Sequence, residues 1–422
     1  MPERIPCKNP DCTNLILPDT AARNDGLCMP CVHAKAKRER DEYIRRNRRD
    51  LNEFEGITNS VDTLKVIHRP RKFDPLVNWI PHPTPTDQLY ASLTADEAQR
   101  MAEFAEGLIG TEHHDQAEEI CLCLAAFTEA NLDGCLRRLL QQGTVLPSMP
   151  FHRAPPDVRD ALLTMLDNES MLRRNHILLA LAWIGDAVVV EQFHEWRRKP
   201  PTWSSTLYVP PHAYSRQAGW ELTASGGRRD LYFSHCTHLE KAASNNLPGF
   251  RSTLERTDTC PCCGTTLTNL FDIDPAQCGL GRVGNWHNSI TIATCENCTA
   301  YGTVFGVVDD NGHARWSPNN ARPTYLPDSG DIVKLPNDVL QLGRQRSPLF
   351  AADQFLPTSY SQLGGHPTWI QDAEYPNCPE CAETMMFLAQ INREDIEDLA
   401  EGMYYGFICP TCRTTATSYQ QT

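Results

Sequence analysis

The chain has 422 residues, of which 41% are hydrophobic, and it carries a net charge of −14. Its length predicts about two to four domains, and its apolar content excludes a wholly disordered chain. Residues 1–50 hold 11 Lys and Arg against 8 Asp and Glu (net +3), which leaves 28 against 45 (net −17) for the rest. An acidic body of this kind disfavours broad binding to nucleic acid or anionic membranes and favours a basic protein partner.

The beginning of the chain shows no charged region followed by an apolar stretch, so we expect no secretory signal and a cytoplasmic location. The most apolar segment, Ile177 to Val190, is interrupted by Gly185-Asp186 and is too short to span a membrane. In a reducing compartment, the 18 cysteines favour metal ligation over disulfide bonds.

Twelve of the cysteines form three groups of four, each made of two closely spaced pairs. A Cys-x2-Cys turn directs two thiolates at one point, and a second pair completes a tetrahedral shell that leaves no position open for water. We therefore predict three structural zinc sites. The ligands are Cys7, Cys12, Cys28 and Cys31 for the first site, Cys260, Cys263, Cys295 and Cys298 for the second, and Cys378, Cys381, Cys409 and Cys412 for the third. Cys262 could exchange with a neighbouring ligand, and Cys236 and Cys278 stay unassigned.

The first predicted domain, residues 1–54, combines a zinc knuckle with a charged helix from Ala34 to Phe54. Basic and acidic side chains alternate over residues 35–49. This pattern suits a solvated helix with i,i+4 ion pairs, and it also suits a surface that grips a phosphate backbone. Residues 55–86, which end in the proline-rich stretch 81–86, are predicted to form a linker.

Residues 87–200 are predicted to form a helical domain. Thr94 and Glu97 have the spacing of a capping box for a helix that runs to about Ile109. Further helices are expected at 117–130, 132–142, 156–166, 176–184 and 187–197. The last two, hinged at Gly185-Asp186, resemble a HEAT-type repeat and predict a short α-solenoid, with a simple helical bundle as the alternative.

Residues 201–422 read as a β-rich domain, with strands expected at 289–294 and 301–308. Two stretches of this domain follow the same order of knuckle, strand, loop, strand, knuckle and strand. The first begins at Cys260 and the second at Cys378. We predict a duplicated zinc ribbon. The complete fold is then a multidomain α+β protein with an N-terminal knuckle and basic helix, a HEAT-like middle and a duplicated-ribbon end.

The segment Gly364 to Gln371, with the sequence GGHPTWIQ, and the stretch Met386 to Ile391 resemble the YwqG-like bacterial domain over residues 205–422. Many members of that family lie beside secreted polymorphic toxins, so the resemblance implies an immunity role and supplies no active site. From the residues alone, Gly364, Gly365 and Pro367 specify a turn and Trp369 an apolar anchor, which favours a role in the fold.

We find no combination of nucleophile, base and oxyanion donor in the sequence and expect a protein that is not an enzyme. The expected function is a bacterial immunity protein that binds a basic toxin domain and occludes its active site. Aromatic contacts are expected from the pool of Trp196, Trp203, Trp220, Trp286 and Trp316. The alternative is a nucleic-acid- or ribosome-associated zinc-ribbon protein that binds through residues 35–49. A third possibility, an enzyme centred on His235-Cys236-Thr237-His238, requires activity that Cys236→Ala abolishes.

Overall fold

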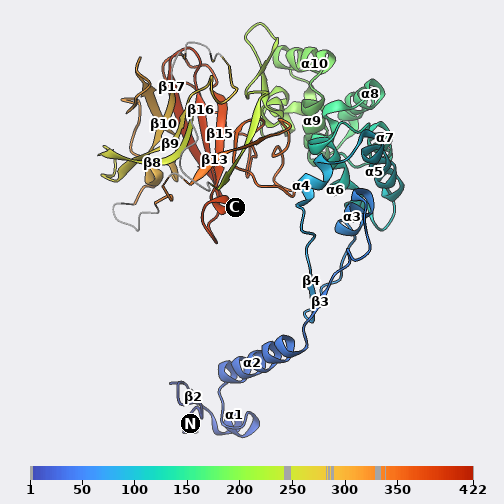
Figure 1. Cartoon of the computed structure of the whole chain (residues 1–422), viewed down its shortest axis with the longest axis vertical. Helices are drawn as coiled ribbons and strands as arrows, with labels where there is room; N and C mark the ends of the chain where they lie inside the picture. The colour runs from blue at the N-terminus through green and yellow to red at the C-terminus, as the bar shows by residue number, and fades with distance from the viewer. Residues whose placement is uncertain are drawn as a thin grey trace. The chain divides into compact units, whose positions relative to one another are not determined.

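The computed structural model describes residues 3–241, 249–281, 283, 286, 289–327, 334–337 and 339–421 (Figure 1). The chain divides into two compact units, residues 1–84 and 85–422. The boundary between them falls within the segment 55–86 that was predicted as a linker. Among the described residues, no helix is both long and apolar enough to cross a membrane.

The first unit is built around a long helix with a small cysteine-bearing turn before it. Its elements are β1 (Ile5–Pro6), β2 (Leu15–Ile16), α1 (Pro18–Arg23), α2 (Met29–Asn47), β3 (Arg49–Leu51), α3 (Ser60–Ile67) and β4 (Val77–Trp79). Strands β1 and β2 pair antiparallel, whereas β3 and β4 pair parallel.

Two sequence expectations for this unit need correction. The charged helix was predicted at 34–54, but α2 begins at Met29 because Cys28 is the extended cap residue and Pro30 suits a first helical turn. It ends at Asn47 because the next residues enter β3. The segment predicted as linker contains α3, whose Val61 and Leu64 are buried, and β4.

The second unit begins with helices close to the predicted positions. These are α4 (Thr86–Ala91), α5 (Ala95–Leu108), α6 (His114–Phe127), α7 (Asp133–Gln141), η1 (Met149–Arg153), α8 (Pro156–Met165), η2 (Leu166–Asn168), α9 (Met171–Ile184), α10 (Ala187–Arg198), η3 (Thr202–Thr206) and η4 (Pro211–Ala218). The capping box at Thr94 and Glu97 is confirmed. Gly185 ends α9 in a left-handed conformation, and the side chain of Asp186 caps α10.

The rest of the second unit is mostly strands, and the mixed helical and β-rich character of the prediction is confirmed. The strands are β5 (Trp220–Leu222), β6 (Arg228–Asp230), β7 (Cys236–Lys241), β8 (Phe250–Thr259), β9 (Thr266–Ile273), β10 (Ile290–Thr294), β11 (Val304–Val308), β12 (Ala314–Trp316), β13 (Leu340–Gln345), β14 (Gln362–Gly364), β15 (Met386–Asn392), β16 (Met403–Ile408) and β17 (Thr414–Gln420); short α11 (Glu296–Thr299) and η5 (Arg393–Asp395) lie among them.

Eight strands form one antiparallel sheet in the order β12-β11-β17-β16-β15-β14-β7-β13, and three form a second sheet, β10-β9-β8. The two predicted repeats diverge at their third strand. In the second repeat, β15, β16 and β17 are neighbours in one sheet, whereas β11 of the first repeat leaves β9 and β10. Instead, β11 pairs antiparallel with β17, so that Val304 lies opposite Thr417. The third strands of the two repeats therefore join each other.

The segment Gly364 to Gln371 has the structural role that its composition predicted. A Cβ atom on Gly364 would lie 1.9 Å from the carbonyl oxygen of His235, and φ is +70° there, so only glycine fits. Gln390, fully buried on β15, accepts a hydrogen bond from the backbone N–H of Thr368 (2.9 Å) and donates one to the carbonyl of Tyr360 (2.7 Å). These buried bonds fasten the segment to the sheet.

Candidate metal centres

The structure brings the twelve predicted ligands together in the three groups that the sequence indicated. Within each group of four, all sulfur atoms lie within 4.8 Å of one another. The first group joins the β1–β2 turn to the first turn of α2. The second joins the turn after β8 to α11, and the third joins the turn before β15 to the turn between β16 and β17.

The sulfur separations suit a tetrahedral metal site and exclude disulfide bonds. The Sγ–Sγ distance is 3.6 Å for Cys12 and Cys28, 3.4 Å for Cys263 and Cys295, and 3.7 Å for Cys381 and Cys409. A disulfide needs about 2.05 Å. Four sulfurs at about 2.3 Å from a central ion are about 3.8 Å apart. Each group could therefore hold one metal ion, and all eighteen cysteines are free thiols.

Three of the turns share one backbone design. The N–H of the first cysteine donates to the carbonyl five residues later, at 2.7 Å for Cys260, 2.8 Å for Cys378 and 2.8 Å for Cys409. The fourth residue after that cysteine has a positive φ in every case. It is Gly264 (+78°), Ala382 (+62°) or Arg413 (+51°). This design turns the chain so tightly that both thiols of the pair face one point.

Hydrogen bonds favour the thiolate form of one cysteine in each group. The side-chain amide of Asn14 and the backbone of Cys31 lower the pKa of Cys28 to about 6. Hydrogen bonds from the thiols of Cys295 and Cys298 lower the pKa of Cys260. Burial opposes the same shift at Cys378, but backbone N–H groups outweigh it, so its pKa is also lowered. Because thiolates are the metal-binding form, these contacts prepare the groups for a cation.

The remaining cysteines do not join the groups. Cys262 lies between two ligands of the second group but is not among the four that converge. Burial raises the pKa of Cys278 to about 12. Cys121, Cys123 and Cys135 are buried in α6 and α7.

In the cluster at residues 235–238, alternation along β7 places Cys236 and His238 on one face and Thr237 on the other. Cys236 is fully buried, and burial raises the pKa of its thiol, which disfavours a nucleophilic role. His238 contacts the hydroxyl of Ser359, and burial lowers the pKa of its imidazole. Within the described residues, no carboxylate is hydrogen-bonded to the other ring nitrogen of His238, so this pair does not form a catalytic triad.

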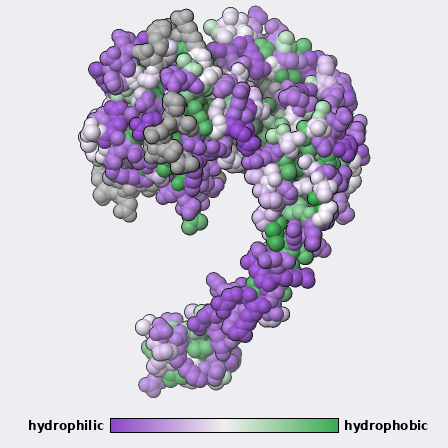
Figure 2. All heavy atoms as spheres, in the orientation of Figure 1, coloured by the Kyte–Doolittle hydropathy of each residue, from purple (hydrophilic) through white to green (hydrophobic). Residues whose placement is uncertain are grey.

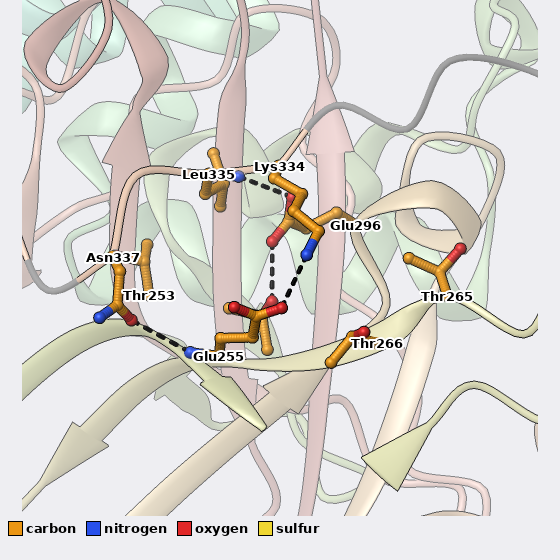
Figure 3. A pocket seen from close by; sticks show the side chains of 9 residues that line it. Thr253, Glu255, Thr265, Thr266, Glu296, Lys334, Leu335 and Asn337 are labelled. Carbon is orange, nitrogen blue, oxygen red and sulfur yellow. Dashed lines mark hydrogen bonds and ion pairs between the residues drawn. The ribbon is translucent and has the colours of Figure 1, made fainter. Parts of the chain in front are cut away.

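A small pocket of about 40 Å³ lies beside the second group (Figure 3). Polar side chains that line it are hydrogen-bonded or ion-paired to other residues of the protein. The carboxylate of Glu296 accepts from the hydroxyl of Thr268 (2.7 Å) and from the backbone N–H of Leu335 (2.8 Å). Lys334 is ion-paired with Glu255 at 2.7 Å. These bonds fix residues 334–337 against β8 and β9, and they support the fold around the second group.

A larger cleft of about 600 Å³ was not foreseen. It lies between α9 and η4 on one side and residues 352–355 and 369–373 on the other. Trp183 and Trp369 line it, and its rim carries Leu172, Tyr208 and Phe355, which are 64%, 88% and 77% exposed. Large apolar side chains gathered around one hollow are typical of a binding surface.

From the sequence, other tryptophans than Trp183 and Trp369 were expected to contact a partner protein. Trp203, Trp220 and Trp286 of the expected pool are buried, and none of the five lines the cleft. The cleft is lined by segments far apart in the sequence, so no local sequence pattern indicated it. The one local signal was Tyr208, which lies next to Val209 in a short stretch between proline pairs.

Comparisons with known proteins assign no activity to this arrangement. A family model described as a domain of unknown function (DUF1963) matches residues 361–417, which include the Gly364 turn and β15 to most of β17. The uncharacterised protein YpfL of Salmonella typhimurium is 55% identical over 427 residues, and the alignment covers both chains completely. No solved structure matches this chain.

Proposed function

This chain belongs to the family of the uncharacterised Salmonella protein YpfL, and we propose that it is a bacterial immunity protein that binds a toxin domain and occludes the toxin's active site. The observation that carries this proposal is the aromatic-rimmed cleft of the second unit. The cleft is large, open and apolar at its rim, and it offers the kind of pocket in which anchor side chains of a partner protein are buried.

The net negative charge of the second unit favours a partner with a positively charged surface. Residues 85–422 contain 24 Lys and Arg against 41 Asp and Glu, which is a net charge of −17. Asp353 and Asp372 line the cleft, and Arg216, the arginine among its described lining residues, is ion-paired with Glu221. An acidic surface of this kind steers a basic partner and increases its rate of association. A basic toxin domain is therefore the expected occupant.

The finer architecture is part of the same proposal. We propose that the three cysteine groups bind zinc, that the repeats starting at Cys260 and Cys378 are zinc ribbons, and that the helices α5–α10 form a HEAT-like stack. Tetrahedral shells of four thiolates support zinc, since they suit its preferred coordination and leave no open position for substrate. A closed metal site has no open position at which a substrate could react, and we propose that this protein acts by binding and is not an enzyme. The resemblance to the YwqG-like domain supports the immunity role.

The neighbouring gene provides the direct test. We expect the gene immediately upstream to encode a secreted toxin with a variable C-terminal domain, and we expect that domain to form a complex with this protein on co-expression. If no toxin is encoded there, or if the purified toxin domain does not bind, the immunity proposal is wrong.

Cleft variants test where the toxin domain binds. Tyr208→Ser and Phe355→Ser remove exposed rings and leave the core untouched, and each is expected to weaken binding by about 2 kcal/mol if the ring is an anchor. Tyr325→Ser is the matched control, because Tyr325 is 84% exposed and lies outside the cleft. Isothermal titration calorimetry with the toxin domain measures the difference. Equal affinities for all three variants would place the interface elsewhere.

A further inference from the structure

Helix α2 of the first unit presents an unusually polar and exposed surface. Of its nineteen residues, Cys31 alone is buried, and Figure 2 shows the helix as a continuous hydrophilic stretch. A helix that buries almost nothing in its own unit gains little stability from packing. Its surface is therefore available for a ligand.

The charges of α2 are separated around the helix axis. With about 100° of rotation per residue, Lys35, Glu39, Glu42 and Arg46 fall on one side. There, Lys35 pairs with Glu39 (3.9 Å) and Arg46 pairs with Glu42, so this side is neutral.

The opposite side of α2 is basic. Lys37, Arg38, Arg40 and Arg45 fall within an arc of about 160°, with Asp41 as the acidic residue among them. In the part of the chain that the structure describes, none of these four cations takes part in an ion pair. We call these four residues the basic face.

An exposed aromatic ring lies in the loop that leads into β4. Phe73 is 92% exposed and follows Lys72. The loop meets the end of α2, because the N–H of Arg49 donates to the carbonyl of Leu76 (2.9 Å). The side chain of Arg48 donates to Asn78 at 3.1 Å, which joins the same two segments. The ring and Lys72 therefore lie in a loop anchored next to the basic C-terminal end of the helix.

We propose that the first unit binds single-stranded nucleic acid, with the basic face on the phosphates and Phe73 stacked on a base. Unpaired bases stack on exposed aromatic rings, which a duplex does not allow. Charge supports the assignment, because residues 1–84 hold 15 Lys and Arg against 12 Asp and Glu (net +3), opposite in sign to the second unit. This activity goes beyond toxin binding, which uses the cleft of the second unit.

Fluorescence anisotropy of the full-length protein with a labelled oligothymidylate of about 16 nucleotides tests the proposal. We expect binding that weakens with salt, with a slope of log K against log[salt] near −3 for about four phosphate contacts. The double variant Lys37→Gln/Arg45→Gln is expected to reduce that slope by about 1.4. Phe73→Ala is expected to weaken binding roughly tenfold and leave the slope unchanged.

Controls separate this proposal from a nonspecific charge effect and from an acidic protein partner. Lys35→Gln removes a cation from the neutral side, and its effect is expected to be less than twofold. Unchanged circular dichroism and metal content would show that each variant is folded. No binding at 50 mM salt, equal affinity for a duplex of the same length, equal affinity of the basic-face variant, or equal competition by polyglutamate would each overturn the proposal.

Discussion

Two glycines with similar positive φ values allow the role of the GGHPTWIQ turn to be tested against an internal standard. Gly364 and Gly264 have φ values of +70° and +78°. A Cβ atom on Gly364 would lie 1.9 Å from the carbonyl oxygen of His235, whereas one on Gly264 would meet no atom within 4 Å. The substitutions Gly364→Ala and Gly264→Ala therefore share the backbone strain and differ only in the clash.

The expected magnitudes follow from this difference. Left-handed backbone costs an alanine about 1–2 kcal/mol, and this is the whole cost at Gly264. At Gly364, the β14–β7 pairing must separate to relieve the clash, and the buried bonds of Gln390 and Thr368 are disturbed with it. We expect a loss of more than about 4 kcal/mol, the range in which a backbone clash and a broken buried network combine.

Urea unfolding followed by tryptophan fluorescence measures both variants against the parent protein. The ring of Trp369 lies in the affected segment, where it contacts Tyr405 with centroids 4.9 Å apart, so its emission reports on this part of the unit. If the two alanine variants have the same stability, the turn does not hold the sheet in the way we describe. A failure of Gly364→Ala to fold, with Gly264→Ala folding normally, would support the same conclusion as a large measured loss.

Two further predictions concern the turn at Ala382 and the buried histidine His366. Ala382→Gly removes the strain of a positive φ (+62°) at an exposed position, so thermal unfolding should show a gain in stability of about 0.5–1 kcal/mol. Ala300→Gly is the control: Ala300 has an unstrained φ of −65° at the end of α11, so glycine there should lower stability by about 0.5–1 kcal/mol through the entropy of the unfolded chain. Burial lowers the pKa of His366 from 6.5 to about 4, so the unfolded state binds a proton that the folded state does not in this range. The free energy of unfolding should therefore fall by up to about 3 kcal/mol between pH 6.5 and 4, and this fall should be smaller in His366→Gln. An identical pH profile in both proteins would contradict a buried neutral imidazole at this position.

The cysteines of the three groups were predictable from the sequence because their geometry is local. A pair such as Cys378 and Cys381 has one short spacing that places two thiols together, and the pairing into fours followed from the order along the chain. The boundaries of α2 were less accessible, since Cys28 serves both as a metal-site residue and as the helix cap. A pattern of basic residues shows where a helix passes but does not show where it begins.

Long-range features could not be read from the sequence. Strand β11 of the first repeat pairs with β17 of the second repeat. Nothing in the sequence of either repeat indicates that their third strands pair with each other. The cleft brings Tyr208 to residues 352–355, and neither segment carries a pattern that indicates the other. The helix α3 in the segment predicted as a linker has only eight residues, which is too short a stretch for helical periodicity to be recognised with certainty from the sequence.

We propose that the three closed four-thiolate sites each hold one zinc ion and serve structure. The most direct test is to measure zinc released by a thiol-modifying reagent while hydrogen exchange reports on each element. We expect three zinc ions per chain, with exchange protection lost around the three cysteine groups and retained in helices α5, α6 and α9. Fewer than three ions, or protection of those helices lost in step with the metal, would contradict it.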